Sequence, residues 1–244
     1  MFDSLIHFFY IILYQPLFNL LVLLYNYVPG HDFGIAIIFL TVIIRVILFP
    51  VSVKAVNSQR GLQKLQPKIQ EAQKKYKDDK EKQAKEILEL YKTEKINPFS
   101  GLLLAIIQLP ILIALYQVFW NGLNPKELVS LYSFVVNPGP INSFFLNVID
   151  LSKPNLIFAV LAGLTQYFQT KMLMPSAPDG KTSSTPDFSK VMQKQMVYFL
   201  PVFTVIILIG LPSALGLYWT ASGIFSIVQQ YFIFKKNKPE IINQ

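Results

Sequence analysis

The sequence predicts an all-α, polytopic membrane protein with five transmembrane helices around a hydrophilic groove, an outer interfacial helix and a cytoplasmic helical hairpin. Hydrophobic residues make up 52% of the chain, and they come in blocks of spanning length separated by charged stretches. The five blocks cover residues 33–53, 99–120, 154–173, 195–211 and 213–234. Such blocks leave no room for a soluble core.

The basic residues predict the orientation of the spans. Of the 22 Lys and Arg residues, 12 lie in residues 51–98, 4 in residues 171–194 and 3 after Phe234. The other connections hold only Lys126 and Lys153. Because cytoplasmic loops carry an excess of Lys and Arg, the basic segments and the C-terminus are expected in the cytoplasm, and the N-terminus outside.

Residues 1–32 are predicted to form an amphipathic helix on the outer face. The segment 5–28 is apolar enough to span, but Gln15, Asn19 and Asn26 fall on one face of a helix. That pattern favours a helix lying in the outer interface. A sixth span is the alternative.

The first span, residues 33–54, contains Arg45 in an otherwise apolar run. A charge near the centre of a spanning helix costs roughly 2.5–3.5 kcal/mol on insertion scales. Ser52 and Lys54, the first plausible interface residues after it, lie about 10–13 Å away along a helix, farther than an Arg side chain reaches. The sequence therefore favours a wet cavity facing Arg45 over snorkelling to the interface, which is the alternative.

Residues 55–96 are predicted to form a cytoplasmic helical hairpin. Two short apolar seams are separated by the polar turn Lys77-Asp78-Asp79. The seams consist of Leu62, Leu65, Ile69, Ala72 and Tyr76, and of Ala84, Ile87, Leu88 and Tyr91. A solvated charged linker is the alternative reading of the same pattern.

Residues 97–234 are predicted to supply the four remaining spans of the core, and residues 235–244 a short cytoplasmic tail. Polar side chains form stripes on several of the spans. They are Thr41, Arg45 and Ser52 on the first span, Gln108 on the second, Thr165, Gln166, Gln169 and Thr170 on the third, and Trp219, Ser222, Ser226 and Gln229 on the fifth. Singly they are explained by hydrogen bonds between helices. Together with Arg45, they favour a shared hydrated cavity, and no acidic residue lies in any span to pair with Arg45.

The sequence gives no support for catalysis, so we do not expect an enzyme. His7 and His31, the only histidines, lie outside the five spans, and no pair of titratable groups suited to catalysis and no cluster of metal ligands falls within them. No nucleotide-binding motif is found, and no cofactor is expected. Recognition of a nucleic-acid sequence is not expected either, because the basic residues of 51–98 alternate with seven acidic ones.

Several spaced motifs resemble those of one family. They are Phe33-Gly34-Ile35-Ala36-Ile37, Arg45-Val46-Ile47-Leu48-Phe49-Pro50, Leu65-Gln66-Pro67-Lys68-Ile69, Asn97-Pro98-Phe99-Ser100-Gly101, Ile107-Gln108-Leu109-Pro110-Ile111, Phe199-Leu200-Pro201, Gly216-Leu217-Tyr218-Trp219 and Gln229-Gln230. In this order they resemble the YidC-type membrane protein insertases, over most of the chain. The chain departs from the family pattern at Gly223, where Asn is frequent, and at Leu104, where Pro is frequent. Unlike many Gram-negative members, it carries no large periplasmic domain before the core.

The resemblance implies a groove formed by the five spans, open to the cytoplasm and to lipid and closed outside. The groove Arg of the family matches Arg45, and its substrate-contacting aromatic matches Trp219. A groove Gln on the third span matches either Gln166 or Gln169. With the polar stripes, this gives the predicted substrate-binding groove: Thr41, Arg45, Gln108, Gln166, Gln169, Trp219, Ser222 and Ser226.

The implied function is insertion of short polar tails and hydrophobic segments of client proteins from the cytoplasm into the bilayer, without nucleotide hydrolysis. Assistance to membrane protein folding, with or without the Sec channel, is also implied. The expected location is the bacterial plasma (inner) membrane. The expected partners are nascent membrane protein clients and the lipid bilayer, with the Sec translocon, the signal recognition particle receptor and the ribosome as further candidates.

Two other classes are weighed against an insertase. A small transporter would have inverted repeats and paired ionisable groups, and the sequence has neither a clear internal repeat nor an acidic partner for Arg45. A chaperone for membrane protein assembly is closer, and would be a second activity of the same groove.

Overall fold

The computed structural model describes residues 2–97, 99–122, 124–173 and 195–236. Most of the connection predicted at 171–194 and of the tail predicted at 235–244 lies outside these residues. The helices are α1 (Phe2–Phe9), α2 (Gln15–Tyr27), α3 (Phe33–Ile47), α4 (Phe49–Lys75), α5 (Lys80–Thr93), α6 (Ser100–Asn121), α7 (Leu156–Met172), α9 (Leu200–Ile209) and α10 (Ser213–Lys236). Short turns of π-helix (η1, Tyr10–Tyr14; η4, Gln195–Phe199) and of 3-10 helix (η2, Pro29–His31; η3, Pro125–Ser130) extend or connect them.

The molecule is predominantly helical, as predicted, with one small exception. Strands β1 (Phe144–Phe145) and β2 (Ile149–Asp150) pair antiparallel in the connection before α7. The β1 strand lies on α3, where Gly34 leaves room for the ring of Phe145. Two-residue strands carry too little periodic pattern to be predicted from sequence.

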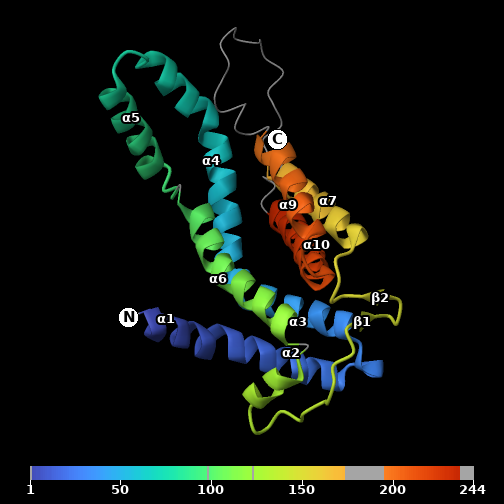
Figure 1. Cartoon of the computed structure of the whole chain (residues 1–244). Coiled ribbons are helices and arrows are strands. Elements are labelled where there is room, and N and C mark those ends of the chain that lie inside the picture. The colour runs from blue at the N-terminus through green and yellow to red at the C-terminus, as the bar shows by residue number, and fades with distance from the viewer. Residues whose placement is uncertain (1, 98, 123, 174–194, 237–244) are drawn as a thin grey trace.

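The N-terminal rod, α1–η1–α2, crosses the lower end of the molecule, transverse to α7 and α10 (Figure 1). Its polar stripe contacts a loop of the same chain. Gln15 and Asn19 donate to the backbone oxygen of Ser130 at 3.1 Å, Asn19 accepts from the backbone N–H of Tyr132 at 2.6 Å, and Asn26 donates to the oxygen of Val136 at 2.7 Å. The stripe is therefore an internal docking face.

In the described part of the chain, few helices are both long enough and apolar enough to count as candidate membrane spans. The segment Ile6–Tyr27 is long and apolar enough to cross a membrane, and α3 with α4 qualifies only as a bent pair. The segments Ile106–Asn121 and Val197–Ile209 are shorter apolar helices.

The predicted first span is broken. Between α3 and α4 the helix axis turns by 66°, and Leu48 caps the end of α3. Pro50 lies in the first turn of α4. The break follows from proline chemistry, because Pro has no N–H for the helical ladder and its ring would clash with the carbonyl oxygen of Val46. Helix α4 then continues through the boundary predicted at residue 54.

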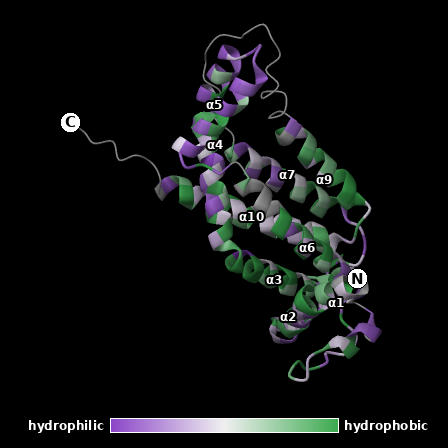
Figure 2. Cartoon of the chain, turned by 90° about the vertical axis from the view of Figure 1, so that its left-hand side faces the viewer, coloured by the Kyte–Doolittle hydropathy of each residue, from purple (hydrophilic) through white to green (hydrophobic). Residues whose placement is uncertain are grey.

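Helices α4 and α5 form the predicted hairpin, which is the most hydrophilic part of the molecule (Figure 2). The carboxylate of Asp79 caps α5 by accepting from the N–H of Lys82. Leu65 and Ala72 of the first seam are buried, whereas Leu88 of the second is 56% exposed. The hairpin thus buries part of its apolar pattern and leaves the rest on its surface.

Helix α7 packs against both α9 and α10, and glycines set these close approaches. A Cβ at Gly163 would lie 2.4 Å from Val205, one at Gly216 2.9 Å from Phe158, and one at Gly223 2.6 Å from the hydroxyl of Thr165. Small residues of this kind allow helices in membranes to approach closely.

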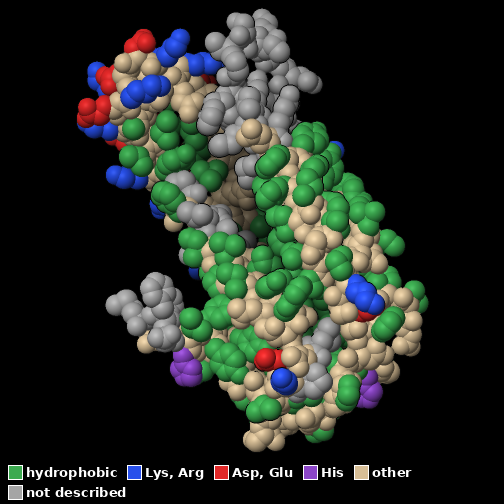
Figure 3. All heavy atoms as spheres, viewed as in Figure 1, with side chains coloured by type: hydrophobic (Ala, Val, Ile, Leu, Met, Phe, Trp, Pro, Cys, Tyr) green, Lys and Arg blue, Asp and Glu red, His purple; other side chains and the backbone are tan. Residues whose placement is uncertain are grey.

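The core lies where α2, α3, α6, α7 and α10 converge, near the N-terminal rod. Its largest fully buried side chains include Phe18, Phe33, Phe119 and Tyr218. The backbone N–H groups of Ser213 and Ala214 bond to the oxygens of Lys153 and Leu151, so α10 begins at this end. Outside the charged hairpin, apolar side chains cover much of the outward faces of the helices, and the surface is hollowed between α6 and the α9–α10 side (Figure 3).

Candidate functional site

A polar cavity of about 360 Å³ lies among α3, α6, α7 and α10. Its lining consists of Arg45, Gln108, Leu112, Gln166, Gln169, Thr170, Tyr218, Trp219, Ser222 and Gly223. Six of the eight residues predicted for the groove are in this set. At 1.5 Å per residue, Ser222 lies about 14 Å along α10 from its start and Gln166 about 15 Å along α7, so both are away from the helix ends.

Arg45 is held by Ser222 across the α3–α10 contact. Its Nε donates to the Ser222 hydroxyl at 2.6 Å, and one of its terminal nitrogens donates to the same oxygen. Arg45 lies in the last turn of α3, where the partial negative charge of the helix end favours a cation. Arg45 is partly buried and lines the cavity, and the bonds to Ser222 hold its side chain there.

No carboxylate neutralises Arg45 within the described segments. The four ion pairs found there lie in the hairpin and in the connection between α6 and α7: Lys68–Glu94, Lys82–Asp79, Lys85–Glu81 and Lys153–Asp150. The cavity therefore presents one net positive charge.

Helix α6 contributes one polar and one apolar group to the cavity. The amide of Gln108 donates to the hydroxyl of Tyr218 at 2.6 Å, which joins α6 to α10. Tyr218 was not predicted as a site residue. The available signal was its spacing, since it precedes Ser222 by four residues and so shares that helical face.

The α7 wall supplies amides and a hydroxyl. Both Gln166 and Gln169 line the cavity, so both of the alternatives that the sequence left open for the groove Gln lie at this site. Thr170 donates its hydroxyl to the backbone oxygen of Gln166 at 2.8 Å. Among the described residues, Gln166 Oε1 is buried without a hydrogen-bond partner.

Thr41 and Ser226 were predicted for the groove, but they are not among the residues lining this cavity. Both are nearly inaccessible, at 0% and 4% exposed. Each hydroxyl bonds within its own helix, to the oxygen of Ile37 at 2.7 Å and of Ser222 at 3.0 Å.

An apolar cavity of about 290 Å³ adjoins the polar one and shares Leu112 and Trp219 with it. It lies among α6, α9 and α10. Its remaining lining residues are Ile113, Tyr116, Thr204, Ile207, Leu208, Leu211 and Leu215. Trp219 therefore stands between a polar compartment and an apolar one.

The donor set does not form a metal site. In the part of the chain that the structure describes, no three His, Cys, Asp or Glu side chains come together as a candidate metal site. The cavity offers a cation, amides and hydroxyls, which bind polar and anionic groups through hydrogen bonds and charge.

The comparisons with known proteins agree with one another. The family model described as 60Kd inner membrane protein matches residues 23–240. A membrane protein insertase YidC of Geobacter metallireducens is 34% identical over 223 residues, which is 91% of this chain and 36% of that protein. One of Syntrophus aciditrophicus is 36% identical over 224 residues, with the same shares.

A relative of similar size is also found. A membrane protein insertase YidC of Fusobacterium nucleatum is 33% identical over 205 residues, covering 84% of this chain and 87% of that protein. The chain thus spans about a third of the length of the Geobacter and Syntrophus relatives and most of the Fusobacterium one. The chain belongs to the YidC-type membrane protein insertase family, the family of the 60Kd inner membrane protein.

Proposed function

We propose that this protein inserts client membrane proteins by receiving a short polar tail in the Arg45 cavity and releasing the apolar segment beside Trp219. The observation that carries the proposal is the junction of the two cavities. A positive, polar compartment and an apolar one share Leu112 and Trp219. A client with a polar end and an apolar segment matches both compartments at once.

The polar compartment would lower the main free-energy cost of insertion, which is the transfer of polar groups into hydrocarbon. In hydrocarbon, each unsatisfied backbone polar group costs several kcal/mol, so a short tail cannot cross dry lipid cheaply. A hydrated cavity at mid-depth shortens the dry path. The unpartnered oxygen of Gln166 and the cation of Arg45 supply an acceptor and donors for polar client groups.

The apolar segment of the client supplies the driving force. Each Leu or Ile at the centre of a span contributes about 0.3–0.6 kcal/mol on insertion scales. A span of such residues offsets the transfer of a short tail, and no nucleotide hydrolysis is required. The apolar cavity among α6, α9 and α10 is the place where this segment would meet the protein before it enters lipid.

The proposed arrangement has five spans, formed by α3 with the start of α4, α6, α7, η4–α9, and α10. The N-terminal rod lies at the outer face, and the hairpin and the C-terminus lie in the cytoplasm. This orientation rests on the 19 basic residues placed in the connections assigned to the cytoplasm and in the tail. The hairpin, with its exposed Leu88, is the surface proposed for contact with clients and with the targeting machinery.

Reconstitution tests the proposed activity. The purified protein is placed in liposomes with a client that has one span and a short polar tail, and protection of the tail from added protease is measured. We expect protection in proteoliposomes and not in empty liposomes. Equal protection in both would contradict an insertase. Crosslinks confined to clients that are already inserted would favour a folding chaperone instead.

A further inference from the structure

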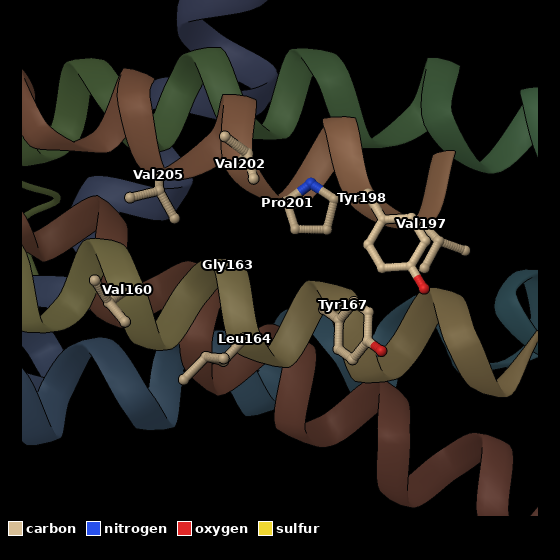
Figure 4. Close-up of a pocket in the computed structure, with 9 residues that line it drawn as sticks. All are labelled: Val160, Gly163, Leu164, Tyr167, Val197, Tyr198, Pro201, Val202 and Val205. Carbon is tan, nitrogen blue, oxygen red and sulfur yellow. The ribbon is translucent and has the colours of Figure 1, made fainter. Parts of the chain in front are cut away.

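A second apolar groove of about 240 Å³ lies on the α7–α9 face and shares no lining residue with the two cavities of the candidate site. Its lining includes Val160 and Leu164 of α7 and Val202 and Val205 of α9, and Figure 4 shows Gly163 on the side of α7 that is next to α9. Gly163 lies at the closest approach, since a Cβ there would come within 3.1 Å of the backbone oxygen of Pro201. The groove is therefore formed by the packing of α7 against α9.

One end of the groove is polar. Tyr167 and Tyr198 lie there with ring centroids 6.0 Å apart, and both hydroxyls point toward the end where Val197 lies (Figure 4). The Lys171 ammonium lies 5.5 Å from the centre of the Tyr167 ring. Among the described residues, neither hydroxyl has a hydrogen-bond partner and Lys171 has no carboxylate partner. The groove thus joins a hydrocarbon slot to two hydroxyls and a cation.

We propose that this groove binds one anionic phospholipid, with an acyl chain in the slot and the phosphate at Lys171 and the two tyrosine hydroxyls. The apolar slot alone would not favour one phospholipid over another, because lipid tails are as apolar as the side chains that line the slot. Preference for this lipid comes from the polar end. A Lys near the surface attracts anionic headgroups, and tyrosines favour headgroup depth.

The position of the polar end assigns the leaflet. Lys171 lies in the last turn of α7, one residue from its end at Met172. That end leads into the connection proposed to be cytoplasmic, so the lipid belongs to the inner leaflet. The assignment to the inner leaflet rests on the proposed orientation, whereas the binding of an anionic lipid does not.

The bound lipid would hold α9 in place. One side of α9 faces the groove through Val202 and Val205, and the other faces the apolar cavity of the candidate site through Thr204 and Ile207. A chain packed in the groove therefore fixes the helix that forms one wall of that cavity. Anionic lipid should raise the unfolding temperature of the protein for the same reason.

Native mass spectrometry of the purified full chain tests the proposal. The protein in detergent is mixed with phosphatidylglycerol and phosphatidylcholine of identical acyl chains, and the retained lipids are counted. We expect phosphatidylglycerol to be retained in preference. Lys171→Gln should reduce that preference about fivefold, since a cation near an anionic headgroup contributes about that factor. Lys92→Gln, an exposed cation of the hairpin, should not.

Two further pairs separate the slot from the headgroup site. Val202→Trp fills the slot and should lower retention of both lipids, whereas Val228→Trp, on the exposed face of α10, should not. Tyr198→Phe removes only a hydroxyl and should lower the preference for phosphatidylglycerol, whereas Tyr231→Phe, of similar exposure, should leave it unchanged. Each variant is checked by size-exclusion chromatography and thermal unfolding.

Four results would overturn the proposal. The first is equal retention of the two lipids by the unsubstituted protein. The others are equal effects within any of the three pairs: Lys171→Gln and Lys92→Gln, Val202→Trp and Val228→Trp, or Tyr198→Phe and Tyr231→Phe. Because Tyr198→Phe is nearly isosteric, it still decides the matter if a larger substitution prevents folding.

Discussion

Arg45 shows how a charge is accommodated inside an apolar helix. The break at Leu48 leaves Arg45 in the last turn of α3, where the partial negative charge of the helix end favours a cation. Ser222 accepts two of its donors, and the remaining part of the guanidinium faces the polar cavity. The guanidinium of Arg45 therefore loses only part of its contact with water, and its charge remains available to an incoming anionic group.

Ser222→Ala tests whether the position of Arg45 matters as well as its charge. The variant keeps the cation but removes the acceptor that fixes it. We expect insertion of a client with an acidic tail to fall about two- to tenfold, the effect of a net hydrogen-bond contribution of about 0.5–1.5 kcal/mol. The measurement is the protection of the client tail from added protease in proteoliposomes.

Thr220→Ala is the matched control for this substitution. Thr220 lies on the same helix, is also buried, and donates its hydroxyl to the oxygen of Gly216 in its own helix. Insertion by this variant should remain near that of the unsubstituted protein. An equal loss in both variants would show that packing of α10, and not the contact with Arg45, sets the rate.

Much of the cavity could be predicted from residue types and spacing. Arg45, Gln108, Gln166, Gln169, Trp219 and Ser222 were all predicted from polar stripes and a resemblance, and the structure brings them together. The same stripes also contained Thr41 and Ser226, which face helix contacts instead. A stripe gives the face of a helix, but the crossing of neighbouring helices decides how much of that face is left open.

At the scale of elements, glycine determines how closely α7 and α10 approach. Gly223→Ala would place a Cβ 2.6 Å from the hydroxyl and 2.8 Å from the Cβ of Thr165, so the helices must separate. We expect a loss of about 1–3 kcal/mol in the free energy of unfolding, measured by thermal or denaturant unfolding in detergent. The Asn that is frequent in the family at this position would meet the same obstacle here.

Gly210→Ala provides the control for that substitution. A Cβ there would lie 3.7 Å from the nearest atom, the oxygen of Ile207, which is ordinary contact. The φ angle of Gly210 is −94°, which Ala adopts readily. We expect no loss, and a gain of up to about 1 kcal/mol from the more restricted unfolded chain. Equal destabilisation by both substitutions would contradict the close-packing explanation.

The connection between α6 and α7 contains a carboxylate, Asp150, whose charge stabilises the folded state. Burial raises the pKa of Asp150, but hydrogen bonds from Ser152, Ser143 and Lys153 outweigh it and hold this pKa well below its usual range. A carboxylate whose pKa is lower in the folded state stabilises that state above its unfolded pKa, about 3.9. The contribution is lost as pH falls from there through the folded value.

Asp150→Asn should therefore lower the unfolding temperature at pH 7 and reduce its dependence on pH. Between pH 5 and pH 3, the unfolding temperature of the unsubstituted protein should fall more than that of this variant. Glu89→Gln, on the exposed face of the hairpin, should keep the dependence of the unsubstituted protein. A slope that Asp150→Asn leaves unchanged would assign the pH dependence to other groups.

The helical elements could be predicted more fully than their ends and partners. Apolar blocks predicted α6, α7, α10 and the η4–α9 segment, because long periodic segments carry a strong signal. The break before α4 was missed because Pro50 was placed inside the block. The polar stripe of the N-terminal rod was used to predict a helix in the outer interface, and the sequence contains no sign that its partner is a loop more than 100 residues away. Single-chain periodicity carries no information on such a partner.

At the scale of the whole molecule, the proposed orientation can be tested with single cysteines, because the sequence has none. Ser133→Cys lies in the exposed outer loop and Thr93→Cys at the exposed end of α5. An impermeant maleimide should label the first in intact cells and the second only after lysis. The reverse pattern would invert the molecule in the membrane.

The hydration of the cavity can be tested by the same chemistry on neighbouring residues of α7. Gln169 lines the polar cavity, whereas Phe168 is 53% exposed on the outside of the helix. Gln169→Cys should react with a water-soluble thiol reagent added from the cytoplasmic side, and Phe168→Cys, facing lipid, should be protected. Equal protection of the two would indicate a dry bundle, and equal reaction would indicate that α7 is not in the membrane as proposed.

The central claim, that the charge of Arg45 receives the polar tail, is tested most directly by crossing Arg45 substitutions with the charge of the client tail. In proteoliposomes, Arg45→Ala should reduce protection of an acidic tail at least about tenfold, since losing a hydrogen bond to a charged group costs about 1.5–3 kcal/mol. Arg45→Lys should retain much of the activity, because the charge remains although the fork geometry of the guanidinium is lost. A neutralised tail should depend less on Arg45. Equal losses for acidic and neutral tails, or full activity of Arg45→Ala on both, would contradict the claim.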